Sequence, residues 1–265
     1  MFFQSLGRQF YILFVITIAV LSACSQSADE LQNIKTDRLP NGLEIVVITD
    51  TRAPVITHMI WYKAGAMDDP EGKSGIAHYF EHLMFKGTKT LAPGEFSEKI
   101  AMMGGSENAF TAYDYTAYFQ RISADKLTEV MKLEADRMSN LVFVESQALS
   151  ERDVVLEERA SRTDSSPSAL LGEKLRHVLH QPHPYARPII GWRHEIEKLN
   201  LEDAKNFYKR FYAPDNAILV VAGDIDMPEV QRLAAKYYGV IPPANKPKNQ
   251  LIKADSLSAP ETIYM

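Results

Sequence analysis

The residues best suited to chemistry form a short run, His78-Tyr79-Phe80-Glu81-His82. On an α-helix each residue advances by about 100°, so His78 and His82 differ by only about 40° and lie one turn apart. Two imidazoles placed in this way can bind the same metal ion. Glu81 lies about 60° to the other side of His78, on the same helix face. The spacing predicts a metal ion with two nitrogen ligands and a carboxylate beside it.

This arrangement suits zinc-dependent hydrolysis. Catalytic zinc takes nitrogen ligands and keeps one position open for water, and a neighbouring carboxylate can accept a proton from that water. The order H-x-x-E-H is the reverse of the H-E-x-x-H motif and is a metallopeptidase signature. The alternative is a chance spacing of two histidines and a glutamate, so the motif needs support from the rest of the sequence.

A third protein ligand is expected, because catalytic zinc sites usually have three. The better candidates lie in the acidic run 151–158, ERDVVLEE, rather than among the remaining histidines. Glu151 and Glu158 are seven residues apart, so they share one face of a helix. The alternative is an acidic helix face that is simply solvated. Periodicity leaves open which of these glutamates would bind the metal.

Hydrophobic patterns predict the elements that must position these residues. The predicted strands cover 43–48, 55–63, 106–111, 117–122 and 217–222, and the predicted helices cover 75–85, 93–103, 125–141, 145–162, 168–179, 201–211 and 228–238. Strands and helices alternate irregularly, which predicts an α+β fold with a mixed, largely antiparallel sheet packed against helices. The histidine run and the acidic run fall on two separate helices, which the fold must bring together.

The first 23 residues are predicted to be the signal peptide of a bacterial lipoprotein. Arg8 supplies a short basic start, and 10–21 is an apolar stretch of about a dozen residues, too short to span a bilayer comfortably. The run 21–24, LSAC, resembles a lipobox, so we expect Cys24 to be lipidated. A plain signal peptide with an incidental cysteine is the alternative. Ser25 rather than an aspartate follows, which by resemblance to bacterial sorting favours the periplasmic face of the outer membrane.

Composition and charge limit the fold classes and functions that remain possible. Hydrophobic residues make up 46% and charged residues 24%, which predicts a folded globular body. The net charge of -5 without a basic stripe argues against nucleic-acid binding. Cys24 is the only cysteine, so no internal disulfide is expected. We expect a signal peptide over 1–23, a polar tether over 24–36, one domain over 37–245, and the start of a linker over 246–265.

Longer stretches of the chain resemble the insulinase and pitrilysin family of zinc metallopeptidases, which includes the mitochondrial processing peptidases. Residues 75–88, GIAHYFEHLMFKGT, are similar to its zinc helix, and 104–111, GGSENAFT, to its substrate-side strand. Further matching segments are 39–43, 151–158, 183–192 and 214–224. The resemblance covers nearly everything from 39 to 239. It implies a processing-peptidase-like metallohydrolase domain, the N-terminal half of a family member.

The resemblance also implies roles for individual residues. It makes Glu81 the general base on zinc-bound water, and Glu151 an acidic residue that supports the site from behind. It places Asn108 and Ala109 on an edge strand along which an extended peptide pairs. It implies one Zn²⁺ per chain with three ligands: His78, His82 and Glu158.

The function implied by the resemblance is a zinc-dependent endopeptidase that hydrolyses peptides or unfolded polypeptides in the cell envelope. Family members normally carry two homologous halves, and the second contributes an arginine and a tyrosine to substrate binding. We therefore expect a second homologous half or a partner subunit. The alternative is a non-catalytic scaffold or partner subunit, or an incomplete fragment. Retention of the residues implied for the metal and the base favours the enzyme.

Overall fold

The structure, a computed structural model, describes residues 33–245. The predicted signal peptide, Cys24, most of the tether and the linker 246–265 lie outside the described residues. Within 33–245, no helix is long and apolar enough to cross a membrane.

Six strands form one sheet. They are β1 (Ile34–Arg38), β2 (Glu44–Thr49), β3 (Val55–Tyr62), β4 (Ser106–Thr111), β5 (Thr116–Ser123) and β6 (Ala217–Gly223). Their order across the sheet is β1-β2-β6-β3-β5-β4. Only the β2–β6 pair is parallel, and the other four pairs are antiparallel. The prediction of a mixed, largely antiparallel sheet is therefore confirmed.

Strand β6 holds the sheet together although it comes from near the end of the described chain. Its sequence AILVVAG is wholly apolar, as expected for a strand with neighbours on both edges. It runs parallel to β2 and antiparallel to β3, between the two. Segments about 170 residues apart thus complete a single sheet.

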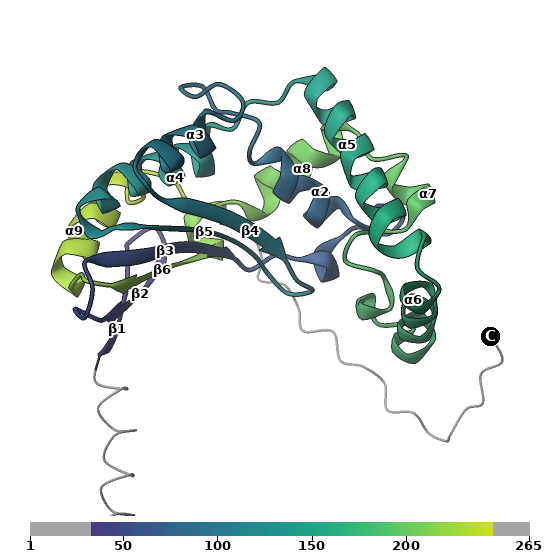
Figure 1. The fold of residues 1–265 in the computed structure, drawn as a ribbon, viewed down its shortest axis with the longest axis horizontal. Helices are drawn as coiled ribbons and strands as arrows, with labels where there is room; N and C mark the ends of the chain where they lie inside the picture. Colours follow the sequence, from purple (N-terminus) through teal and green to yellow (C-terminus); the bar gives the residue numbers. More distant parts are fainter. Residues whose placement is uncertain (1–32, 246–265) are drawn as a thin grey trace, which may run out of the picture.

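Some of the helices lie over one face of the sheet and the others lie past the end of its strands, as Figure 1 shows. The α-helices are α2 (Ile76–Leu83), α3 (Glu95–Met102), α4 (Leu127–Asn140), α5 (Glu145–Arg159), α6 (Pro167–His180), α7 (Arg193–Ile196), α8 (Leu201–Phe211) and α9 (Met227–Tyr237). Short 3₁₀ turns are η1 (Ala66–Asp68), η2 (Ala124–Lys126), η4 (Pro184–Ala186) and η5 (Pro214–Asn216), and η3 (Ala160–Asp164) is a π-helix. Helix α2 contacts α5, α8 and β4, so it lies where these elements meet.

Three predictions of local structure were wrong. The tether does not extend to residue 36, because β1 begins at Ile34; this exposed edge strand, IKTDR, lacks the apolar alternation that marks a half-buried strand. The helix predicted to reach Arg162 ends as an α-helix at Arg159 and continues as the π-helix η3. The four-residue helix α7 was not predicted, because it is too short to show a periodic pattern.

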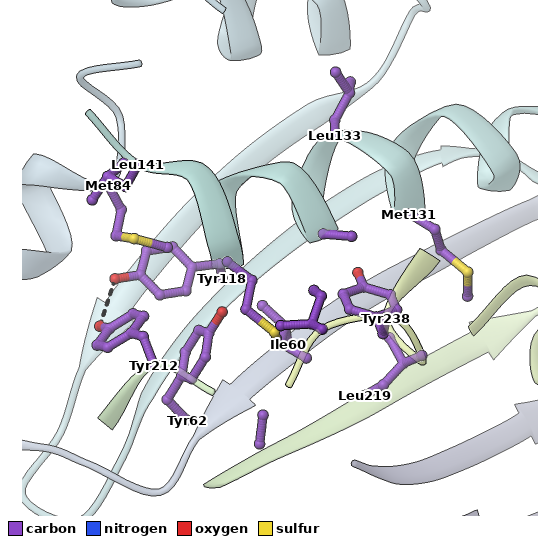
Figure 2. Packing of buried hydrophobic residues seen from close by; sticks show 14 of the residues in the cluster. Ile60, Tyr62, Met84, Tyr118, Met131, Leu133, Leu141, Tyr212, Leu219 and Tyr238 are labelled. Atoms are coloured by element: carbon purple, nitrogen blue, oxygen red, sulfur yellow. Dashed lines mark hydrogen bonds between the residues drawn. The ribbon is translucent and has the colours of Figure 1, made fainter. Parts of the chain in front are cut away.

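A cluster of tyrosines lies between the sheet and α2. Figure 2 shows Tyr118 and Tyr212 with their hydroxyls joined by a hydrogen bond of 2.9 Å. Tyr62 stacks on Tyr212 with ring centroids 4.0 Å apart, and the Tyr212 ring lies 4.6 Å from that of Phe80 on α2. The paired hydroxyls satisfy polar atoms that burial would otherwise leave unbonded. This packing holds the inner face of α2 and turns its other face outward.

Candidate metal centre

The N-terminus of α2 is held by a buried carboxylate. Asp69 accepts hydrogen bonds from the Gly75 N–H at 2.7 Å and the Ala77 N–H at 3.1 Å. The Asp69 residue is only 4% exposed, and this burial raises the pKa of its carboxyl to about 8. Gly75 itself has a φ of +86°, where a side chain would be strained. These contacts fix the point from which α2 starts, at Ile76, two residues before His78.

The buried face of α2 also ties this helix to α5. Tyr79 is buried, and its hydroxyl donates to the Ala148 carbonyl of α5 at 2.7 Å. With Tyr79 and Phe80 turned inward, the opposite face of α2 carries the two histidines and the glutamate of the motif, which are partly buried and line a cleft. The structure therefore places His78, Glu81 and His82 on one side of the helix, as their spacing predicts.

Three donor atoms face one another across α2 and α5. The Glu158 Oε2 lies 3.4 Å from His82 Nε2 and 3.7 Å from His78 Nε2, and the three atoms all lie within 4.8 Å of one another. Two ligands of a tetrahedral zinc ion are about 3.3–3.5 Å apart when each bond is about 2.0–2.2 Å. These separations are near that value and are too long for good hydrogen bonds, so the donor set fits a zinc ion. Glu157, the neighbour of Glu158, is exposed.

Glu151 lies behind His82. Its Oε1 is 2.8 Å from His82 Nδ1, and its Oε2 pairs with the Lys86 ammonium. This contact favours the tautomer with its proton on Nδ1, which leaves the Nε2 lone pair available to a metal. Burial disfavours the charged imidazole, but the hydrogen bond and charge of Glu151 outweigh it and raise the pKa of His82. The structure thus places Glu151 where the resemblance implied.

His78 has a different environment from His82. Burial, with a smaller contribution from His82, lowers the pKa of His78 to about 3. A neutral imidazole is the form that binds metals. Its Nδ1 is buried and has no hydrogen-bond partner within residues 33–245. His78 therefore contributes an uncharged ring whose Nε2 is directed at Glu158.

Glu81 is held by the sheet. The Thr111 hydroxyl, at the end of β4, donates to Glu81 Oε2. Burial raises the pKa of Glu81, although the Thr111 hydrogen bond opposes this rise. The carboxylate lines the same cleft as the histidines, a hollow of about 740 Å³. Its position suits a group that accepts a proton from a water molecule beside the metal site.

The edge strand β4 forms one wall of the cleft. Within the described chain, β4 pairs only with β5, so its other edge is unpaired. The Ala109 N–H donates to its neighbour's side chain, Asn108 Oδ1, at 2.8 Å. The Ala112 N–H faces β5, since it donates to the Tyr115 carbonyl at 2.8 Å, and backbone groups of successive residues point to opposite edges of a strand, so the Ala109 N–H points away from β5. Asn108 and Ala109 both line the cleft and offer a backbone edge to an extended peptide.

Sequence reasoning assigned no role to three further residues of the site. Arg162 pairs with the second oxygen of Glu158, with Nη1 at 2.5 Å from Oε1, and their four-residue spacing could have indicated the contact. Thr111 shares a face of β4 with Ala109, so alternation could have placed it in the cleft. Lys86 lies just beyond the end of α2, and no sequence signal indicates its contact with Glu151.

The chain matches two parts of one protein family. Residues 44–192 match the insulinase family (peptidase family M16), and residues 198–264 match the peptidase M16 inactive domain. The boundary between the two matches falls inside one folded unit, because β6 from the second match pairs with β2 and β3 from the first.

Related proteins and solved structures agree with this assignment. The zinc protease PqqE of Helicobacter pylori is 37% identical over 224 residues, which cover 84% of this chain and 50% of the relative. The crystal structure of a protease from H. pylori matches with a TM-score of 0.80 and 36% identity, over 83% of this chain and 53% of the other. The first half of the periplasmic protease PqqL from Escherichia coli matches with a TM-score of 0.78 and 25% identity, over 85% of this chain and 50% of the other.

A fourth comparison concerns the fold alone. The peptidase M16 inactive domain from Pseudomonas fluorescens has a TM-score of 0.77 at 19% identity, over 84% of this chain and 54% of the other. The chain spans about half the length of the curated relatives it matches. The resemblance seen in the sequence is confirmed: this chain belongs to the insulinase family, peptidase family M16, and corresponds to the N-terminal half of its longer members.

Proposed function

We propose that this chain carries the active site of a zinc-dependent endopeptidase that cleaves peptides or unfolded polypeptides. One observation carries the proposal: His78, His82 and Glu158 direct three donor atoms at a common point inside the cleft that also contains Glu81 and the unpaired edge of β4. Relatives named zinc proteases support zinc as the metal.

The residues of the site have separate roles in peptide hydrolysis. When bound by His78, His82 and Glu158, zinc would supply a Lewis acid that polarises a carbonyl and acidifies water. Glu81 accepts the proton of the attacking water and passes it to the leaving amine. Thr111 holds the Glu81 carboxylate by its hydrogen bond, and the pKa raised by burial makes this carboxylate a stronger base.

The substrate would be bound through its main chain. An extended peptide adds to the free edge of β4, and the Ala109 N–H and carbonyl then pair with peptide groups. Asn108 Oδ1 must first release the Ala109 N–H, which it accepts in the free protein. Recognition through the backbone tolerates many side chains, so we propose broad sequence specificity.

The active enzyme is proposed to include a second half of the same fold, from the same polypeptide or from a partner subunit. The chain spans about half of its relatives, and the inactive domain from P. fluorescens shares its fold. A second half would close the cleft over the peptide and exclude water, which strengthens electrostatic interactions at the site. A non-catalytic partner subunit is the rival function, and the half-length match is the observation that favours it.

The protein is proposed to act in the cell envelope, anchored to the periplasmic face of the outer membrane by a lipid on Cys24. Support comes from the lipobox-like residues 21–24 and from the E. coli relative, which is named a periplasmic protease. Mass spectrometry of the mature N-terminus tests the anchor. Cys24→Ala should abolish lipid labelling, and an unmodified start at Ser25 or later in the wild type would refute the lipoprotein reading.

The function is tested by separating metal binding from chemistry. Glu81→Gln should keep its zinc and lose peptide hydrolysis by about 100- to 10,000-fold, because only the proton transfer is removed. The matched control is Glu157→Gln, an exposed glutamate that should leave both properties unchanged. Both are assayed on unstructured peptides, with the second half or a homologous partner chain added. Activity that survives in Glu81→Gln would remove its assigned role, and zinc binding without any wild-type hydrolysis would favour the non-catalytic subunit.

A further inference from the structure

Arg159 follows Glu158 directly on α5 but points away from the cleft. It is only 4% exposed. Its Nη1 and Nη2 bind the two carboxylate oxygens of Glu173 on α6, each at 2.8 Å, and Nη1 also donates to the Gly191 carbonyl at 2.8 Å. Asp164 of η3 lies 3.3 Å from its Nε. One buried guanidinium therefore joins the end of α5 to three other segments.

The loop that contains Gly191 packs against the start of α2. Gly191 has a φ of +94°, and a Cβ atom placed on it would lie 2.5 Å from the Ser74 carbonyl oxygen. The Trp192 N–H donates to Ser74 Oγ at 2.9 Å, and Ser74 lies two residues before the first residue of α2. Through Gly191, Arg159 thus connects the end of the helix that carries Glu158 with the start of the helix that carries His78.

The connection through Arg159 holds the C-terminal end of α5, whereas other contacts hold its N-terminal part. The beginning is held on α2 by the Tyr79–Ala148 hydrogen bond and by the contact between Glu151 and His82. After Arg159 the chain widens into the π-helix η3, which interrupts the regular backbone ladder directly beyond Glu158. The Arg162 side chain that pairs with Glu158 is 74% exposed, so solvent screens this ion pair and it restrains Glu158 less than a buried contact would.

We propose that Arg159 is a positioning residue that sets the distance between Glu158 and the two histidines by clamping the end of α5 to the 190–192 loop. The proposal rests on the proposed zinc site. It requires arginine specifically, because one planar guanidinium binds both oxygens of Glu173 and still has a donor for the Gly191 carbonyl. A lysine keeps the charge but cannot make these contacts together.

The test measures zinc affinity and thermal stability together in the full chain. Arg159→Lys should weaken zinc binding by about 10- to 100-fold, the usual effect of losing a residue that orients a ligand. The matched control is Arg137→Lys, a second buried arginine, 1% exposed, which pairs with Glu134 on its own helix, α4, and whose guanidinium otherwise lies over the faces of the Phe85, Phe96 and Tyr118 rings. This control should lower the melting temperature at least as much and leave the zinc affinity unchanged. Dissociation constants are measured by competition with a chromophoric chelator, well below both melting temperatures.

The outcomes separate this inference from the proposed function. A wild-type chain that binds no zinc would remove the proposed function itself. A wild type that binds zinc, with equal affinity in Arg159→Lys or equal losses in both lysine variants, would overturn only the role of Arg159. Should Arg159→Lys fail to fold, Glu173→Gln decides, since it removes the charge partner but leaves the Gly191 contact possible. Weaker zinc binding in that variant supports the clamp, and unchanged binding overturns it.

Discussion

Two glycines allow the start of α2 to be tested against a matched control. Gly75 and Gly94 both precede eight-residue helices, α2 and α3, with φ values of +86° and +79°. A Cβ atom on Gly75 would lie 2.4 Å from the Ile190 carbonyl oxygen and 2.9 Å from the Gly191 Cα, whereas nothing lies within 4 Å of one on Gly94. Both alanine variants thus have the backbone strain of a left-handed conformation. Gly75→Ala has a steric clash in addition.

The expected magnitudes follow from these two contributions. A left-handed conformation costs an alanine about 1–2 kcal/mol, so Gly94→Ala should lower the free energy of unfolding by about that amount. The overlap with Ile190 adds about 1–3 kcal/mol in Gly75→Ala, as overpacking does elsewhere. Each kcal/mol corresponds to about 2–4 °C in melting temperature for a domain of this size. Urea denaturation of both variants measures the difference.

The same comparison reports on the metal site. Relief of the clash must move either the 190–192 loop or the start of α2, and His78 lies only three residues after Gly75. Gly75→Ala should therefore weaken zinc binding, while Gly94→Ala should leave it unchanged, as chelator competition would show. Equal losses of stability in the two variants, or wild-type zinc affinity in Gly75→Ala, would refute the reasoning that the close approach of Gly75 to the loop positions the site.

Three other predictions concern single contacts. Glu158→Gln should lose zinc, as determined by metal analysis, whereas Glu157→Gln one residue away should keep it; full occupancy in the first variant would exclude Glu158 as a ligand. Tyr79→Phe removes the hydroxyl bond to the Ala148 carbonyl, which keeps its backbone partner within α5, and should lower the free energy of unfolding by about 0.5–1.5 kcal/mol in urea denaturation. An unchanged free energy of unfolding would show that this hydrogen bond does not stabilise the fold. Burial raises the pKa of the Asp69 carboxyl to about 8, so between about pH 4 and pH 8 the folded protein holds a proton that the unfolded chain releases. The bound proton stabilises the folded protein fully below about pH 4, and this stabilisation is lost as the pH rises through about 8. Asp69→Asn should remove this pH dependence of the free energy of unfolding. An unchanged pH dependence in that variant would contradict the raised pKa.

Local sequence patterns were enough to predict many of the helices and strands. The helix predicted over 201–211 has the observed bounds Leu201–Phe211, because Asn200 caps its first turn and its apolar residues recur at helical spacing. The strand predicted over 106–111 is likewise observed with those bounds. The edge strand β1 escaped prediction, since a strand whose residues are nearly all exposed needs no apolar alternation.

Local patterns also predicted one part of the candidate metal site and left another part open. Helical spacing was enough to show that His78, Glu81 and His82 share a helix face, because three residues within five positions are related by the rotation of about 100° per residue. The sequence also narrowed the third ligand to the run 151–158, but resemblance, and not spacing, distinguished Glu158 from the other glutamates.

The residues that lie across the cleft from α2 became evident only from the packing of the folded chain. This packing placed Glu158 Oε2 3.4 Å from His82 Nε2 and 3.7 Å from His78 Nε2, with Glu157 exposed, and brought Thr111 to Glu81. It also inserted β6 between β2 and β3. The physical reason is that a local pattern sets angles around one helix or strand. The distances between α2, α5 and β4 depend instead on packing and hydrogen bonds between segments far apart in the chain, such as Tyr79 with the Ala148 carbonyl, and no local pattern records these.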